Sequence, residues 1–425
     1  MIEMNKNRLL RLLRWSERYF KTDMVYVARS NFWLLTGRVL TSGSGFALTV
    51  AFANLLSPTD FGTYKYVLAT SGIVAAFTLN GIGAALSRAL NRGQQNVIPS
   101  VFATGVLWSI PSSIVALGIG GYYFYMGNSI LGWSLTVIAL FNPLLANLAI
   151  TKSLFAATGD FRTAIIYNAI RNIVQVGVII GVLFLSRNVL VIIITYFFIS
   201  SAIGYVTYLH SLRVMKVKSD RTHYHEVIEY SKHLSILGAF QLVVGQIDQI
   251  LLWHFATPVA LATYAIAQGP ARELKTVSDN INAMAFPRIA GRTREDAERT
   301  VISKTKYLLV IYVPAIILYI LLAPMLFHIF FPQYLDAIIP SQLLALTVVF
   351  QSRSLADIFL FSHGTIKDRY VVTVPSQCAR IVFLAVFIPL YGLYGAIIAN
   401  ILSEIFSAFM IGYTYKRSKM TTMKL

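Results

Sequence analysis

The chain has 425 residues, of which 56% are hydrophobic and only 13% are charged. Soluble domains carry about a quarter charged residues, so this composition excludes an ordinary water-soluble fold. The formal net charge of +18 would suit a nucleic-acid partner, but membrane proteins also gather Lys and Arg in cytoplasmic loops, and the positions of the charges must decide.

Residues 1–28 precede the first long apolar run. Their segment RLLRLLRWSER (8–18) interleaves leucines with arginines. It lacks both the uninterrupted apolar stretch and the small-residue cleavage site of a signal peptide. We expect a basic amphipathic helix on the anionic cytoplasmic leaflet, and a disordered basic tail is the alternative.

Twelve mostly apolar stretches follow, and each has the roughly twenty residues that a helix needs to cross a bilayer. The first six are residues 29–55, 62–87, 97–120, 130–151, 163–185 and 189–210. The second six are residues 234–256, 259–286, 305–330, 337–362, 370–390 and 394–414. They predict an all-α integral membrane protein with a six-helix lobe at 29–212, a basic linker at 213–233 and a second lobe with a basic tail at 234–425.

The basic residues are distributed unevenly over the connections between these spans. Of the 36 Lys and Arg, 28 lie on one side, six lie within spans, and only Lys65 and Arg187 lie on the other side. The positive-inside rule then places both termini in the cytoplasm and removes nucleic acid as the preferred explanation of the charge. The external connections are short, which leaves little room for an extracellular catalytic domain.

An internal repeat relates the two halves. The segment SPTDFGTY (57–64) recurs in outline as TPVALATY (257–264), at an offset of 200 residues. A second pair, FAATGDFR (155–162) and FSHGTIK (361–367), follows the fourth span of each half. Because each half has an even number of spans, the two repeats run in the same sense, and the cleft between them is the expected substrate path.

Several segments together resemble a known family. They are LLSPTDFGTYKYVLA (55–69), SLFAATGDFRTAIIYNAIRNIV (153–174), VVGQIDQILLWHFATPVALATYAIA (243–267), FFPQYLDA (330–337) and LYGAIIAN (393–400). They are similar to the Wzx-like polysaccharide-biosynthesis flippases, which include O-antigen flippases, of the MATE-related MOP superfamily. The resemblance covers nearly the whole chain.

That resemblance implies a fold, an activity and a location. The fold would be a MATE-like, V-shaped bundle of two lobes. The protein would move an undecaprenyl-pyrophosphate-linked oligosaccharide from the inner to the outer leaflet of a bacterial or archaeal plasma membrane. Its expected partners are that lipid-linked oligosaccharide and proteins of polysaccharide synthesis or polymerisation.

The eighth span carries a polar face. Gln268, Arg272, Lys275, Asp279 and Asn282 are spaced 4, 3, 4 and 3 residues apart, which places them on one side of a helix. Ionisable side chains at membrane depth are costly, so such residues are candidates for a functional cavity. We therefore expect this face to line a cavity rather than to contact lipid.

Cations within the spans predict a site for a pyrophosphate group, because guanidinium groups are permanently charged, bidentate donors to phosphate. The predicted donors are Arg38, Arg171, Arg272, Lys275 and Arg380. The predicted polar wall consists of Asn168, Gln175, Gln268 and Asn282. The alternative is that these side chains pair within the bundle or reach the cytoplasmic interface.

Carboxylates within the spans are candidates for binding a coupling ion, either a proton or Na⁺. They are Asp248, Asp279, Asp357 and Glu404. Structural pairing is the alternative for each; Arg353 and Asp357, for example, have the i, i+4 spacing of a helical ion pair. The sequence predicts no catalytic residue, metal site or other cofactor, since the single Cys378 and the scattered histidines lack ligand spacing.

Flipping by alternating access is thus the leading functional hypothesis, and the chain is not expected to be an enzyme. A MATE-type multidrug or ion antiporter is the alternative, although a cavity for organic cations should be acidic or aromatic. A membrane glycosyltransferase or polymerase would need a long external loop that this map lacks. A lipid scramblase or a structural partner in a synthesis complex also stays open.

Overall fold

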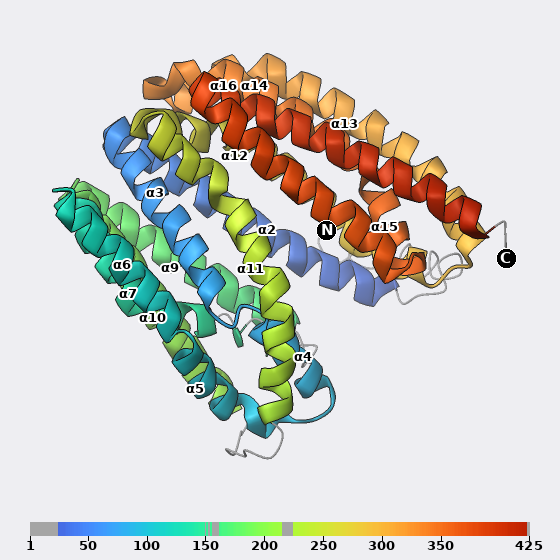
Figure 1. The fold of residues 1–425 in the computed structure, drawn as a ribbon, viewed down its shortest axis with the longest axis horizontal. Coiled ribbons are helices and arrows are strands. Elements are labelled where there is room, and N and C mark those ends of the chain that lie inside the picture. The colour runs from blue at the N-terminus through green and yellow to red at the C-terminus, as the bar shows by residue number, and fades with distance from the viewer. Residues whose placement is uncertain (1–23, 149, 152–153, 155–160, 215–223, 423–425) are drawn as a thin grey trace, which may run out of the picture. The chain divides into compact units, whose positions relative to one another are not determined.

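The computed structural model describes residues 24–148, 150–151, 154, 161–214 and 224–422, and it is helical throughout this part of the chain (Figure 1). Most of the predicted amphipathic segment and residues 215–223 of the predicted linker lie outside the described residues, whereas residues 213–214 and 224–233 of the linker are helical. The first half contains α2 Met24–Leu55, α3 Pro58–Val74, α4 Ile82–Asn91, α5 Ile98–Trp108, α6 Ile110–Tyr125, α7 Ser129–Leu148, α9 Phe161–Leu185 and α10 Val189–Val214. The second half contains α11 Tyr224–Phe255, α12 Pro258–Ala290, α13 Arg294–Phe330, η3 Pro332–Ala337, α14 Ile338–Leu346, η4 Thr347–Arg353, α15 Ser354–His363 and α16 Ile366–Thr422.

In the described part of the chain, each predicted span coincides with one helix or with a series of shorter helices. Among the described residues, eight helices are by themselves long and apolar enough to cross a membrane, or nine if the bent pair α3 and α4 counts as one span. The helix α16 contains two predicted spans, which Figure 1 shows as two adjacent runs. Gly392 separates them with φ of 55° and ψ of −125°, a conformation that favours glycine. The total of twelve spans and the orientation of the termini stay predictions.

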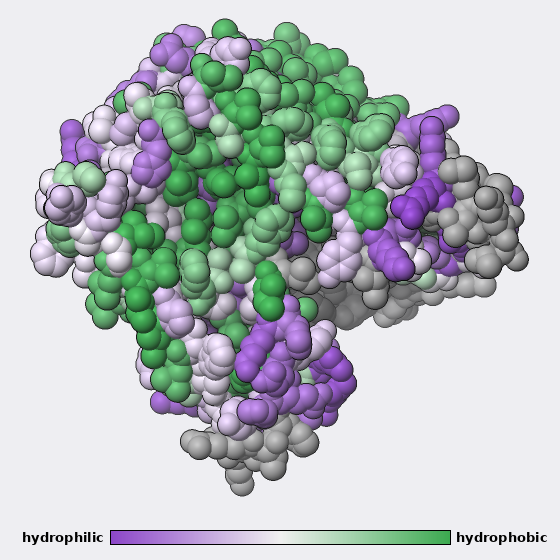
Figure 2. Space-filling view, in the orientation of Figure 1, coloured by the Kyte–Doolittle hydropathy of each residue, from purple (hydrophilic) through white to green (hydrophobic). Residues whose placement is uncertain are grey.

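Exposed apolar side chains cover the helices on their outer faces. On α13, Val310, Leu318 and Leu321 are 70%, 58% and 72% exposed. Figure 2 shows hydrophobic residues spread over the helices, while hydrophilic residues gather around α4, the start of α11 and the end of α16. A soluble protein does not expose continuous apolar surface of this extent, so the chain is a multi-pass membrane protein.

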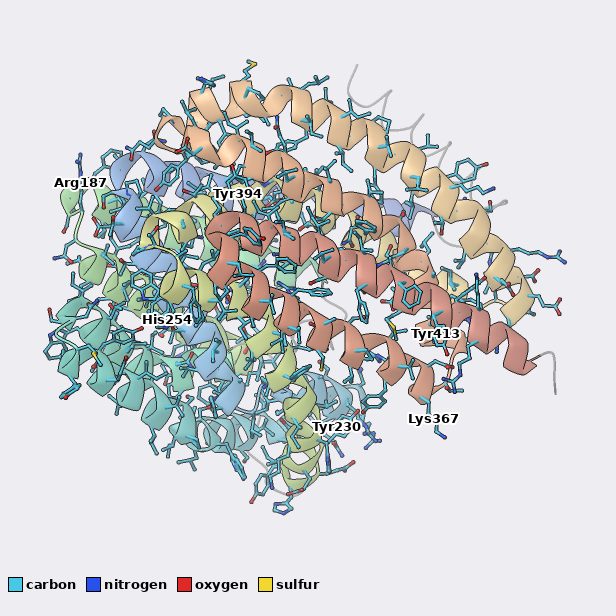
Figure 3. All side chains as sticks on the ribbon, turned by 45° about the horizontal axis from the view of Figure 1, so that its top comes forward. Arg187, Tyr230, His254, Lys367, Tyr394 and Tyr413 are labelled. Atoms are coloured by element: carbon cyan, nitrogen blue, oxygen red, sulfur yellow. The ribbon has the colours of Figure 1, made fainter. Side chains whose placement is uncertain are left out.

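Charged and interfacial residues mark the helix ends. In the first unit defined below, Arg187, just after α9, and Tyr230, on α11, lie at opposite ends of the bundle (Figure 3). In the second unit, Lys367 at the start of α16 and Tyr394 just after the break at Gly392 lie far apart, at opposite ends of the helices (Figure 3). The predicted cytoplasmic and external connections therefore separate to different ends within each unit.

Contacts divide the chain into two units. The first unit comprises residues 1–49 and 74–240, and the second comprises residues 50–73 and 241–425. In the first unit α7 packs against α6 and α10, and α10 packs against α9. In the second unit α12 packs against α14 and α15, and α13 packs against α14 and η4. Each unit has its own buried apolar cluster, around Leu86 and Ile98 in the first and around Tyr312 and Phe359 in the second.

The unit boundaries differ from the predicted lobe boundaries because α3 groups with the second half. The two repeated segments are the reason. Gly62 lies so close to Pro258 that an added Cβ would be 1.9 Å from the proline carbonyl oxygen. Tyr66 stacks on Trp253 with ring centroids 4.6 Å apart. A glycine at position 62 is thus what allows the starts of α3 and α12 to meet.

Both repeated segments begin a helix in the same way. Ser57 Oγ accepts a hydrogen bond from the Asp60 backbone N–H at 3.1 Å, and Thr257 Oγ1 accepts one from the Ala260 N–H at 3.0 Å. A proline follows each capping residue at the first helical position, where its missing N–H costs no hydrogen bond. The sequence repeat is therefore a repeated helix start, which fixes where α3 and α12 begin.

Candidate functional site

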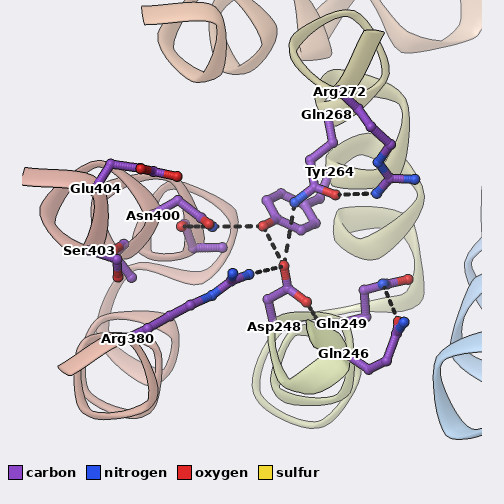
Figure 4. A network of polar contacts seen from close by, with 12 residues as sticks. Gln246, Asp248, Gln249, Tyr264, Gln268, Arg272, Arg380, Asn400, Ser403 and Glu404 are labelled. Atoms are coloured by element: carbon purple, nitrogen blue, oxygen red, sulfur yellow. Dashed lines mark hydrogen bonds and ion pairs between the residues drawn. The ribbon is translucent and has the colours of Figure 1, made fainter. Parts of the chain in front are cut away.

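A polar network surrounds Asp248 in the second unit (Figure 4). Asp248 is on α11 and is only 2% exposed. Its Oδ2 accepts from the Tyr264 hydroxyl at 2.8 Å and lies 3.4 Å from the Gln268 amide nitrogen and 3.6 Å from Nη2 of Arg380. Its Oδ1 accepts from the Gln249 backbone N–H at 2.9 Å. Donors from three helices, α11, α12 and α16, thus stabilise a buried carboxylate anion.

Tyr264 connects this carboxylate to the last run of α16. The tyrosine is fully buried on α12, and its hydroxyl oxygen accepts a hydrogen bond from the Asn400 amide at 2.8 Å. The same amide nitrogen donates to the Ala396 carbonyl at 2.8 Å. Two of the segments that carry the family resemblance, residues 243–267 and 393–400, therefore meet at the Tyr264 hydroxyl.

Glu404 bridges two cations from different elements. Its Oε2 lies 2.5 Å from Nη2 of Arg353, and its Oε1 lies 3.5 Å from the Lys275 ammonium. A second Arg353 nitrogen donates to the Glu404 backbone carbonyl. The Arg353 and Glu404 side chains are 20% and 22% exposed, whereas that of Lys275 is 51% exposed. Arg353 is thus held firmly, while Lys275 remains accessible.

Arg272 has a different environment. Its Nη2 donates to the Gln268 side-chain oxygen at 3.0 Å, one helical turn earlier. Within the part of the chain that the structure describes, no carboxylate pairs with it in an ion pair. Lys65 on α3 lies close enough for the two positive charges to repel. Arg272 is therefore a cation whose charge is available to a ligand.

These side chains line a cavity of about 180 Å³ within the second unit. Its charged lining consists of three cations and two carboxylates, namely Arg272, Lys275, Arg380, Asp248 and Glu404. The predicted face of α12 is present here, since Gln268, Arg272 and Lys275 all line the cavity. The side chains of Asp279 and Asn282 are outside the described part. A polar cavity with an excess of positive charge is suited to an anion.

The other predicted cations lie in the first unit. Arg38 is on α2, and Asn168, Arg171 and Gln175 are on α9, all partly buried. The two helices pack closely, because a Cβ at Gly37 would be 2.3 Å from the Ile165 side chain.

Within that unit, Nε of Arg171 is buried and has no hydrogen-bond partner among the described residues. Gln175 hydrogen-bonds the Tyr196 hydroxyl. The first unit therefore offers a partly buried guanidinium whose buried Nε has no partner among the described residues, one helical turn from an amide that already hydrogen-bonds Tyr196.

Three features of the site differ from the sequence prediction. Arg353 pairs with Glu404, and no ion pair to Asp357 is present among the described side chains. Arg353 is the last residue of the 3₁₀ helix η4 and directly precedes α15, and its guanidinium pairs with Glu404 on α16. Lys65, expected in an external connection, is on α3, with its ammonium 5.1 Å from the Phe61 ring centroid. Tyr264 was identified only as part of the internal repeat, and the sequence did not predict it as a site residue.

A bundle of apolar helices around a charged cavity defines the class: an all-α, multi-pass membrane protein. The family model described as "Polysaccharide biosynthesis protein" matches residues 27–291, well over half of the chain. The protein belongs to this polysaccharide biosynthesis family, which confirms the family prediction. No curated protein matches the sequence.

Solved structures of the MOP superfamily share the fold. An inward-facing multidrug resistance MATE family transporter aligns with a TM-score of 0.71 at 14% identity, over 92% of this chain and 99% of the other. The lipid II flippase MurJ, in an inward closed conformation, aligns with a TM-score of 0.73 at 12% identity, over 92% and 87%. A MOP superfamily transporter from Pyrococcus furiosus, whose binding pocket is described as reversed in polarity, aligns with a TM-score of 0.60 at 13% identity, over 92% and 96%. Identities this low establish the MATE-like fold alone.

Proposed function

We propose that this protein flips an undecaprenyl-pyrophosphate-linked oligosaccharide from the inner to the outer leaflet of the plasma membrane by alternating access. The observation that carries the proposal is the positive excess in the cavity of the second unit, where Arg272 has no carboxylate partner among the described residues. A pyrophosphate supplies the missing negative charge, and bidentate guanidinium contacts orient it. The family membership supports a cargo of polysaccharide biosynthesis, and the flippase among the structural relatives supports a lipid-linked one.

Each cation has a distinct role in this proposal. Arg272 and Lys275 bind the pyrophosphate directly, because they are the more exposed cations of the cavity. Arg380 contributes less, since it also faces the Asp248 carboxylate at 3.6 Å. Arg38 and Arg171 provide the phosphate contacts of the first lobe. Both termini are cytoplasmic, and the isoprenoid tail remains in lipid.

Coupling to a proton or Na⁺ is assigned to the carboxylates of the same site. Asp248 is the leading candidate, because cation binding there would compete with Arg380 and with the Tyr264 hydroxyl. Glu404 and Asp357 are the further described candidates. An exporter of organic cations is disfavoured by the same positive excess, since like charges repel in a low-dielectric cavity.

Translocation in liposomes tests the proposal. Purified protein is reconstituted with a labelled undecaprenyl-pyrophosphate-linked oligosaccharide, with and without proton and Na⁺ gradients. We expect Arg272→Ala and Arg171→Ala each to lower the translocation rate at least about tenfold, the equivalent of one lost charged contact of about 1.4 kcal/mol. Arg187→Ala, at the opposite end of the first unit from Tyr230, is the matched control and keeps the wild-type rate. Wild-type rates in both cavity variants, at equal reconstitution, would refute the cationic site.

A further inference from the structure

A second cavity lies beside the first in the second unit. Its volume is about 300 Å³, and the two cavities share Lys275, Gln351 and Glu404 as lining residues. Its walls come from η4, the start of α15 and both runs of α16. A ligand that reaches Arg272 in the first cavity is therefore adjacent to the second.

Half of the residues that line the second cavity are uncharged and polar. It presents two amides and four hydroxyls, from Gln351, Ser354, Thr373, Ser376, Gln377 and Ser407. Its apolar lining is limited to Val372 and Ile411. Small polar residues in membrane helices also serve as interhelical contacts, so their hydrogen bonds decide between packing and binding.

Hydrogen bonding favours binding. Ser376 Oγ donates to its own helix, to the Val372 carbonyl at 2.7 Å. The side-chain amides of Gln351 and Gln377, by contrast, make no hydrogen bond to any other described residue. An amide offers two donors and an acceptor, which is the complement of neighbouring hydroxyl groups on a sugar ring. These two amides are thus arranged for a ligand rather than for the bundle.

The charges of this cavity cancel. Arg353 is 2.5 Å from Glu404, Lys275 is 3.5 Å from the same carboxylate, and Asp357 adds a second negative charge. Two cations and two carboxylates give a formal charge of zero, whereas the first cavity has an excess of one positive charge. A phosphate therefore gains more in the first cavity, and an uncharged polyhydroxyl ligand suits the second.

We propose that the second cavity binds the sugar that is attached directly to the pyrophosphate of the cargo. This inference rests on the proposed function, because it divides that cargo between two adjacent subsites. The pyrophosphate occupies the Arg272 side, the first sugar occupies the side of Gln351 and Gln377, and Lys275 lies at the junction. A volume of about 300 Å³ is at the small end of ligand pockets, which fits one sugar unit rather than the whole chain.

Binding of two lipids to the purified protein in nanodiscs tests this assignment. One lipid is bare undecaprenyl pyrophosphate, and the other is the lipid-linked oligosaccharide that accumulates in the native host when this protein's gene is deleted. We expect the wild type to bind the sugar-bearing lipid about tenfold more tightly. The double variant Thr373→Val, Gln377→Leu, which changes residues of the second cavity only, loses that preference and binds the bare lipid within about twofold of wild type. Gln333→Leu, the same chemical change in η3 outside both cavities, keeps the preference.

The outcomes separate the two proposals. If the wild type binds neither lipid, the flippase proposal itself fails. If it binds both lipids equally, or if the double variant retains the preference, the sugar subsite fails while the flippase proposal stands.

A second measurement tests the sugar subsite without the double variant, in case that variant does not fold. Ser407→Cys and, as a control, the 56% exposed Val382→Cys are made in a Cys378→Ala background and treated with a water-soluble maleimide. We expect Ser407→Cys alone to be labelled, and only the sugar-bearing lipid to protect it. Labelling unaffected by that lipid, or protected equally by both lipids, overturns the subsite.

Discussion

Replacing Asp248 by Asn should destabilise the second unit through Arg380 and Tyr264. The one amide oxygen of Asn can still accept from the Gln249 N–H, whereas its NH₂ group replaces the oxygen that accepts from the Tyr264 hydroxyl, and the Arg380 guanidinium loses its anion at 3.6 Å. Breaking a fully buried ion pair costs about 3–5 kcal/mol. Arg380 is 30% exposed and lines a cavity, so we expect the smaller loss of about 2 kcal/mol, within the range for a hydrogen bond to a charged group.

A double-mutant cycle isolates this contribution. The free energy of unfolding of Asp248→Asn, Arg380→Gln and the double variant is measured by SDS denaturation in mixed micelles, followed by circular dichroism. Because the double variant has no unpaired charge at this position, it should be more stable than the sum of the single losses by about 1–2 kcal/mol. Additive losses, within about 0.5 kcal/mol, would show that Asp248 and Arg380 are not coupled and would refute the reasoning.

Two further predictions use the same unfolding measurement. Gly62→Ala should cost about 1–3 kcal/mol, because its Cβ would be 1.9 Å from the Pro258 carbonyl oxygen. Gly43→Ala, with no atom within 4 Å of the added Cβ, should be neutral or stabilising by up to about 1 kcal/mol, and equal losses in both variants would contradict the close contact. Arg92→Ala should change stability by less than about 1 kcal/mol, because Arg92 and Glu226 are 47% and 58% exposed; a loss above 2 kcal/mol would contradict this.

Local sequence patterns predicted the features that depend only on residues close together in the chain, namely the helices, one polar helix face and two helix starts. Apolar runs gave the helices, because a span is a continuous stretch of chain. The spacing of Gln268, Arg272 and Lys275 gave one face of α12, and the structure places all three along one cavity. The pairs of helix starts were visible as a repeat, because a cap and a following proline are also local features.

The ion pairs could not be predicted in the same way. Glu404 is 51 residues from Arg353 and 129 residues from Lys275, so no spacing rule connects them. The local rule that was available suggested Asp357 as the partner of Arg353, but a spacing rule cannot include Glu404, which belongs to another helix. Lys65 was counted among the external cations although it lies within the predicted span 62–87, and the structure places it on α3.

The duplication explains the scaffold but not the site. At the offset of 200 residues, the capping residues are Ser57 and Thr257, and both are followed by a proline. Tyr64 likewise corresponds to Tyr264. The site residues Asp248, Gln268, Arg272 and Lys275 correspond instead to Leu48, Leu68, Gly72 and Ala75. At Gly72 the absence of a side chain lets α3 pack against Gln246, since a Cβ would be 3.0 Å from that side chain. The position of Gly72 and Arg272 in the repeat thus serves helix packing in one half and carries a charge in the other, so the polar lining of the second-unit cavity is not repeated at these positions of the first half.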